Sequence, residues 1–67
     1  MRCIINGETI HLPSHVSTVA QLLHHFHIHK KIAIVEINMH IVPKEDYEHT
    51  AIADGDRIEI VHFVGGG

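Results

Sequence analysis

The chain has 67 residues, which limits it to one domain and leaves little room for a deep active-site cleft beside a core. Hydrophobic residues make up 45% of the sequence and charged residues 19%, a composition typical of folded domains rather than disordered chains. The net charge is −3 and the basic residues cluster only at Lys30 and Lys31, so a nucleic-acid-binding surface is not expected. We therefore expect a small folded domain that is not an enzyme on its own.

The single cysteine, Cys3, can form neither an intramolecular disulfide nor a CxxC site, so stability is expected to come from packing. We expect Cys3 to be a small core residue and not a nucleophile. The apolar run at residues 3–5 stops at Asn6, far short of a secretion signal or a membrane span. These features predict a cytoplasmic protein that has no membrane partner.

Residues 1–12 predict a β-hairpin. Asn6 and Gly7 lie between two short apolar stretches, and this dipeptide favours a two-residue turn because both residues tolerate positive φ. Alternation along the first strand places Cys3 and Ile5 together on the face that builds the core.

A helix is predicted to begin at Thr18. Gln21 follows three positions later, and in such a capping box each side chain bonds a backbone N–H that the first turn leaves free. Four apolar residues then recur at the spacing of one helical face: Val19, Leu22, Leu23 and Phe26. This stripe is wide enough to cover one face of a sheet, and we expect it to mark the one main helix.

Two further strands are predicted in the middle of the chain. Residues 32–37 form an almost continuously apolar, β-branched run that is too short for a buried helix. Residues 41–42 follow a tight turn and form a short strand that ends at Pro43. Because proline cannot donate a ladder hydrogen bond, this short strand is expected at an edge of the sheet.

The C-terminal part of the sequence predicts a loop followed by a strand. Residues 44–49 favour one turn of 3₁₀ helix or a compact loop, and the Asp-Gly-Asp sequence at residues 54–56 favours a turn. Residues 57–64 predict the last strand. Together the elements predict an α+β β-grasp domain over residues 1–64, in which a mixed sheet of four or five strands holds one helix on one face.

The sequence ends with Gly65, Gly66 and Gly67. At a background usage of about 7%, three glycines at a given tripeptide arise by chance about three times in 10,000. One interpretation is a frayed chain end, and we expect residues 65–67 to form a flexible tail. The functional interpretation is that the carboxylate of Gly67 is the reactive group, because glycines can lie extended in a narrow channel of another protein.

The outward face of the last strand changes from charged to apolar toward this tail. Arg57 and Glu59 are followed on the same face by Val61 and Phe63. An exposed apolar patch of this kind favours docking of a protein partner, and Val64 belongs to the same expected partner-binding surface. The alternative is that a neighbouring strand or loop covers Val61 and Phe63.

Nine histidines are the most conspicuous feature of the composition. His24, His25, His27 and His29 can place pairs at helical spacings of three and four, which suits a surface metal site. No cysteine or carboxylate completes an obvious ligand set. We therefore expect a solvated histidine-rich surface and no metal site.

Four stretches of the sequence together indicate a family. Residues 38–43 read NMHIVP, residues 44–47 read KEDY, residues 54–56 read DGD, and the sequence ends in IEIVHFVGGG. Over essentially its whole length the chain thereby resembles the ThiS-type sulfur carrier proteins of thiamine thiazole biosynthesis. The IVPKEDY stretch and the short length favour this family over the molybdopterin synthase small subunit. The resemblance implies a ubiquitin-like β-grasp fold.

The resemblance also implies a chemical role for the tail. In the family, a ubiquitin-activating-like adenylyltransferase (ThiF type) adenylates the terminal carboxylate, which here is that of Gly67. Sulfur from a cysteine desulfurase or another donor then replaces the adenylate, and the thiocarboxylate donates sulfur to a thiazole synthase (ThiG type). Gly65 and Gly66 are implied to thread the tail into the partner. The chain itself is expected to bind no cofactor, because ATP and Mg²⁺ are used by the activating partner.

Two other functions are compatible with these residues. A sulfur carrier for molybdopterin, cysteine or tRNA thiolation shares the same tail and differs in the enzyme that accepts the sulfur. A non-catalytic β-grasp interaction module binds its partner through the sheet and tolerates loss of Gly67.

Overall fold

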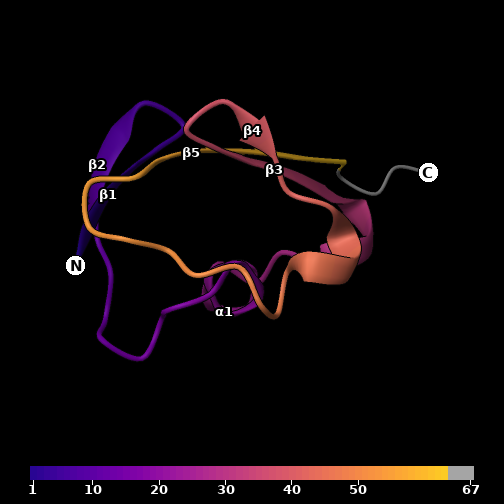
Figure 1. Cartoon of the computed structure of the whole chain (residues 1–67), viewed down its shortest axis with the longest axis horizontal. Coiled ribbons are helices and arrows are strands. Elements are labelled where there is room, and N and C mark those ends of the chain that lie inside the picture. Colours follow the sequence, from indigo (N-terminus) through magenta and orange to yellow (C-terminus); the bar gives the residue numbers. More distant parts are fainter. Residues whose placement is uncertain (64–67) are drawn as a thin grey trace.

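The computed structural model describes residues 1–63, which form a five-stranded sheet with one α-helix against one face (Figure 1). The predicted β-grasp architecture, with a mixed sheet and one main helix, is confirmed. Val64 and the predicted tail, residues 65–67, lie outside the described residues. Within residues 1–63, no helix is both long and apolar enough to cross a membrane.

The predicted hairpin consists of β1 (Arg2–Ile5) and β2 (Glu8–His11), which pair antiparallel. Asn6 and Gly7 form its turn with φ values of 49° and 84°, the left-handed region that this dipeptide favours. The two side chains of β1 that were predicted to face the core are both buried: Cys3 and Ile5.

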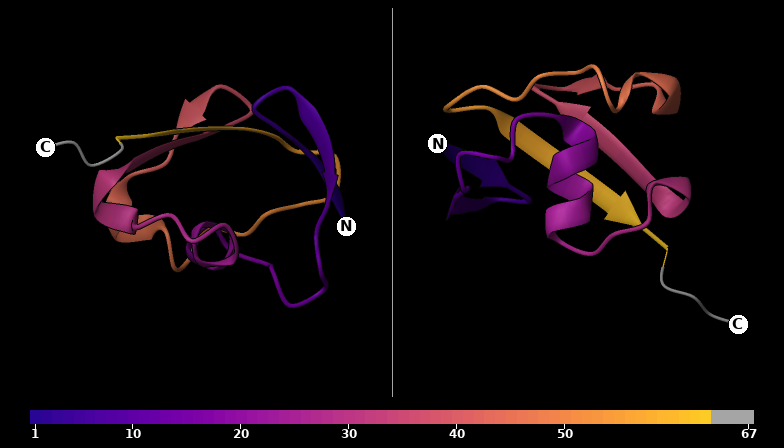
Figure 2. Two further views of the ribbon diagram at one scale, coloured as in Figure 1. Left: turned by 180° about the vertical axis from the view of Figure 1, so that it is seen from behind. Right: turned by 90° about the horizontal axis from the view of Figure 1, so that it is seen from below.

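The helix α1 (Val19–His25) begins at the predicted capping box. Oγ1 of Thr18 accepts the backbone N–H of Gln21 at 3.2 Å, and Oε1 of Gln21 accepts the N–H of Thr18 at 3.1 Å. The helix crosses one face of the sheet (Figure 2). Its predicted apolar stripe faces the core: Val19, Leu22 and Leu23 are buried, and Phe26 is half-buried at the C-cap.

The other strands are β3 (Ala33–Ile37), β4 (His40–Ile41) and β5 (Arg57–His62). The strand order is β2-β1-β5-β3-β4, so β5 is central and β4 lies at the edge, as Pro43 predicts. β5 runs parallel to β1 and antiparallel to β3. A turn of 3₁₀ helix, η2 (Lys44–Asp46), occupies the segment where such a turn was predicted.

The start of the third strand differs from the prediction of residues 32–37. Ile32 belongs to a 3₁₀ helix, η1 (Lys30–Ile32), and the strand begins one residue later. The ring of His29 caps this helix by accepting the backbone N–H of Lys31 at 3.3 Å. This local side-chain cap is the physical reason that the apolar run starts in a turn.

Two other strand boundaries were also wrong. The strand predicted at residues 41–42 begins one residue earlier, because the turn before it uses only two residues, and Val42 lies beyond it. The strand predicted at residues 57–64 ends at His62, whose partner in the ladder is Ala33, the first residue of β3. Regular pairing ends there because β3 begins at that residue.

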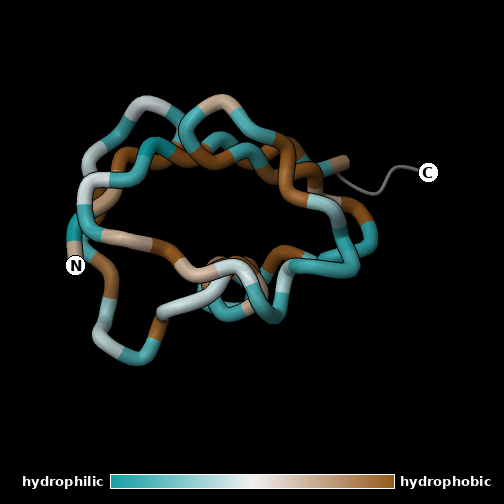
Figure 3. The backbone as a smooth tube through the Cα atoms, viewed as in Figure 1, coloured by the Kyte–Doolittle hydropathy of each residue, from teal (hydrophilic) through white to brown (hydrophobic). Residues whose placement is uncertain are grey.

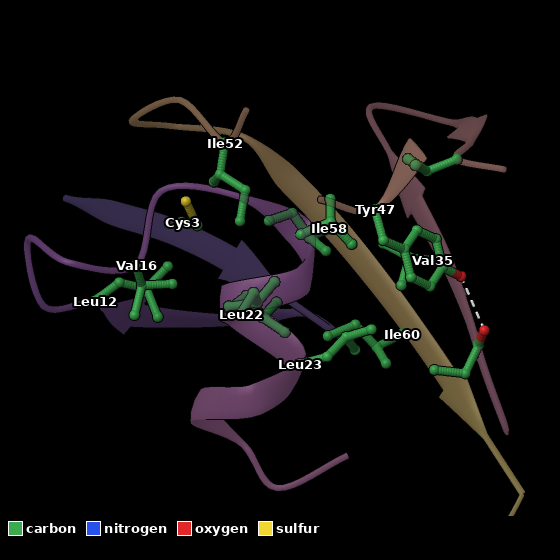
Figure 4. Packing of buried hydrophobic residues seen from close by; sticks show 14 residues of the cluster. Cys3, Leu12, Val16, Leu22, Leu23, Val35, Tyr47, Ile52, Ile58 and Ile60 are labelled. Carbon is green, nitrogen blue, oxygen red and sulfur yellow. Dashed lines mark hydrogen bonds between the residues drawn. The ribbon is translucent and has the colours of Figure 1, made fainter. Parts of the chain in front are cut away.

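One apolar core fills the space between the sheet and α1 (Figure 4). Hydrophobic and hydrophilic residues alternate along the strands of the sheet above α1 (Figure 3). Its largest fully buried side chain is Tyr47, directly after η2, whose hydroxyl donates to the carbonyl of Ala33 at 2.9 Å. Burial raises the pKa of Tyr47, since the charged phenolate loses its hydration. The ring of Tyr47 therefore packs among apolar side chains, and its hydroxyl, the one polar group of the side chain, is hydrogen-bonded.

Replacing Leu23 with alanine should lower the free energy of unfolding by about 2 to 5 kcal/mol, because it leaves a cavity under α1. Urea unfolding followed by circular dichroism measures this change. The matched control is His24→Ala on the same helix, where an exposed side chain is removed and a change within about 0.5 kcal/mol is expected. Equal stability of the two variants would contradict the assigned helix face.

Candidate functional site

The candidate site lies on the outer face of the sheet, opposite α1, at the C-terminal end of β5. All four residues predicted to point outward along this last strand are exposed: Arg57, Glu59, Val61 and Phe63. Val61 is 55% and Phe63 65% accessible to solvent. The alternative that a neighbouring strand or loop covers Val61 and Phe63 is therefore wrong for residues 1–63.

Two isoleucines that the sequence alone did not assign to the site enlarge this surface. Ile34 on β3 lies directly opposite Val61 in the antiparallel register and is 42% exposed. Ile32 is 39% exposed, and its carbonyl accepts the backbone N–H of Phe63 at 3.1 Å. We refer to Ile32, Ile34, Val61 and Phe63 as the outer apolar patch. It combines Ile34 on β3 and Val61 on β5 with Ile32, which ends η1, and Phe63, which follows β5.

The sequence contained a signal for the two isoleucines. The run at residues 32–37 is almost continuously apolar, a pattern typical of strands that are covered on both faces. In the structure α1 covers the inner face, where Ala33 and Val35 are buried. Within residues 1–63, nothing covers the two outward isoleucine side chains, which is typical of a surface that binds another molecule.

Asn6 holds the strand that leads to the site. Its Oδ1 accepts the backbone N–H of Ile60 at 2.7 Å, and its Nδ2 donates to the carbonyl of Ile60 at 3.1 Å. Its own backbone N–H donates to the carbonyl of Ile58 at 2.9 Å. Regular pairing of β1 with β5 stops at Ile5 and Ile58, so the amide side chain continues the ladder beyond the end of β1.

Cys3 takes no part in the candidate site. It is fully buried on the inner face of β1, and desolvation raises the pKa of its thiol, with the negative charge of Asp56 acting in the same direction. A raised pKa disfavours the nucleophilic thiolate. The prediction that Cys3 is a core residue is confirmed.

The histidines lie mostly on the surface, and His24, His27 and His29 are exposed. His25 is half-buried, and its ring packs edge-on against Phe26 and against His15, with centroid distances of 5.1 and 6.4 Å. In the described part of the chain, no group of three or more histidine, cysteine or acidic side chains is placed to hold a metal ion.

A protein-family model described as the ThiS family matches residues 1–67. The chain belongs to the ThiS family. This ThiS-family chain is 43% identical over 63 residues to the sulfur carrier protein ThiS of Bacillus subtilis (strain 168), a match that covers 94% of this chain and 96% of the relative. The family predicted from the NMHIVP, KEDY and DGD stretches is thus confirmed.

A solved structure supports the fold of this ThiS-family chain. The crystal structure of the thiamine biosynthesis protein ThiS from Geobacter metallireducens matches with a TM-score of 0.82 and 29% sequence identity, over 100% of both chains. The ubiquitin-like β-grasp fold that the family resemblance implies is therefore confirmed.

A longer relative contains a segment similar to the whole ThiS-family chain. It is a thiazole synthase of Paramagnetospirillum magneticum (strain ATCC 700264 / AMB-1), 42% identical over 67 residues. The match covers 100% of this chain and 20% of that protein, so the chain spans about a fifth of this relative's length.

Replacing Asn6 with glycine should keep the positive φ of the turn and remove both side-chain bonds to Ile60. A loss of about 1 to 3 kcal/mol in the free energy of unfolding is expected for two such bonds, together with faster amide hydrogen exchange at Ile60. Asn6→Asp separates the two bonds, because its carboxylate can still accept the Ile60 N–H but cannot donate to the Ile60 carbonyl. Unchanged exchange at Ile60 in Asn6→Gly would show that the side chain does not hold β5.

Proposed function

We propose that this chain is a sulfur carrier for thiamine thiazole synthesis and that the carboxylate of Gly67 carries the sulfur. The observation that carries the proposal is the outer apolar patch of a ThiS-family chain, located where β5 leads to Gly65, Gly66 and Gly67. A docking surface next to the tail allows a partner to bind the folded domain while it works on the last residue.

The chemistry begins with activation of the carboxylate, because a free carboxylate is a poor acyl donor. An oxygen of the Gly67 carboxylate attacks the α-phosphorus of ATP, which forms the acyl-adenylate and releases pyrophosphate. A hydrosulfide then attacks the acyl carbon, expels AMP and leaves a thiocarboxylate. If the donor is a persulfide, a thiol must also cleave the sulfur–sulfur bond of the acyl disulfide that forms first.

Enzymes that bind this chain supply the catalytic groups in this proposal. The activating partner is a ThiF-type adenylyltransferase that binds ATP and Mg²⁺, and a cysteine desulfurase or another donor supplies the sulfur. The chain is a co-substrate and not an enzyme, consistent with the name of its Bacillus subtilis relative, a sulfur carrier protein.

A ThiG-type thiazole synthase is the proposed acceptor of the sulfur. The Paramagnetospirillum magneticum relative supports this choice, since a thiazole synthase there includes a segment similar to the whole of this chain. Two functions joined in one polypeptide commonly act on each other, because covalent linkage raises their effective concentration.

Deleting Gly67 should abolish adenylation, because the shortened tail no longer brings its carboxylate to the α-phosphate of ATP. The test mixes the chain with the cognate adenylyltransferase, ATP and Mg²⁺ and follows pyrophosphate release. Adding one glycine after Gly67 is the matched control for tail length and should also abolish release. Thermal unfolding should be unchanged in both variants. Undiminished release from the deletion variant would refute the sulfur-carrier proposal and favour the interaction module.

Replacing Phe63 with serine should weaken binding to the cognate thiazole synthase about 10-fold or more, since the patch loses its aromatic side chain. Isothermal titration calorimetry measures the Kd, and the melting temperature should hardly change because Phe63 is exposed. Met39→Ser is the control, an exposed apolar residue in the turn between β3 and β4 and outside the patch. An equal loss of affinity in both variants would contradict docking at the patch.

A further inference from the structure

Two glutamates face each other on the outer side of the sheet, next to the outer apolar patch. Glu36 on β3 lies directly opposite Glu59 on β5 in the antiparallel register. Residues two positions apart on a strand share a face, so this pair is the next one after Ile34 and Val61 on the same surface. Glu59 is exposed and Glu36 is half-buried.

This pairing is unfavourable in the isolated chain. Side chains directly opposite each other on neighbouring strands have Cβ atoms about 4.5 to 5.5 Å apart, and like charges at such positions destabilise a sheet. Among residues 1–63, the carboxylates that accept hydrogen bonds belong to Asp54 and Asp56 and not to these glutamates. Arg57 precedes Glu59 on the same face of β5, but among residues 1–63 no ion pair joins the two side chains.

The glutamates are bordered by apolar side chains on two sides. Ile34 and Val61 lie along the strands, and Ile41 on β4 lies directly opposite Glu36 and is 68% exposed. A partner that covers these apolar groups must also remove water from the two carboxylates. Removing water from an unpaired carboxylate is strongly unfavourable unless a cation replaces the water.

We propose that the protein that docks on the outer apolar patch presents an arginine or lysine side chain to Glu36 and Glu59. Arginine fits best, because its planar fork of N–H donors can bond two neighbouring carboxylates at once. The partner surface is therefore apolar with a central cation. This inference rests on the proposed function, and the partner to which we assign this surface is the thiazole synthase.

The test measures binding of the full chain to the cognate thiazole synthase by calorimetry at several salt concentrations. Glu59→Gln and Glu36→Gln should each raise the Kd about 10-fold at low salt and reduce its salt dependence, and Glu59→Lys should raise the Kd about 100-fold. The melting temperature should not fall in any of these variants. It should rise in Glu59→Lys, because this change places opposite charges across the two strands. Weaker binding with unchanged or higher stability separates a docking role from a folding role.

Glu48→Gln is the matched control, because it removes the same charge from an exposed residue in the turn after η2. An equal loss of affinity in this control would assign the effect to net charge and overturn the inference. A second outcome is that the wild-type chain binds the synthase, that Phe63→Ser weakens this binding, and that the glutamate variants bind like wild type. In that case the inference fails while the proposed function stands. If wild type binds neither the synthase nor the adenylyltransferase, the proposed function fails and the inference fails with it.

Discussion

The rest of the structure depends on the pairing of β5 between β1 and β3. The parallel ladder to β1 and the antiparallel ladder to β3 fix which side chains of β5 point inward. Ile58 and Ile60 thereby join the core beneath α1, and Val61 faces outward. Because side chains alternate along a strand, a slip of one residue would exchange the core side chains for the surface ones. The same ladders therefore stabilise the fold and form the candidate site.

Asn6 connects this central strand to the hairpin at the start of the chain. The left-handed backbone conformation of Asn6 in the turn places its side-chain amide beside Ile60. There the amide oxygen accepts the backbone N–H of Ile60, and the amide nitrogen donates to the Ile60 carbonyl. Glycine would suit the turn equally well but has no side chain to make these bonds. Asparagine at this position thus meets two requirements, the turn geometry of the hairpin and the anchoring of β5 close to its end.

The outer surface of the sheet combines two features that are energetically unfavourable in the isolated chain. The outer apolar patch exposes hydrophobic side chains to water, and Glu36 faces Glu59 across the strands. A domain of 67 residues has a small core, so each unfavourable surface feature uses a notable share of its stability. In the proposed complex, one partner covers the patch and supplies a cation, so both features become favourable for the same physical reason.

The sequence by itself determined the local elements and the family. Asn6-Gly7 fixed the hairpin turn and the capping box at Thr18 fixed the start of α1, because each depends on residues close together in the chain. Only the tertiary structure decided that Ile34 meets Val61 and that Glu36 meets Glu59. These residues are far apart in the sequence, and their register follows from packing both strands on the same helix. The side-chain cap at His29 likewise shifted the start of β3 in a way that the apolar run did not reveal.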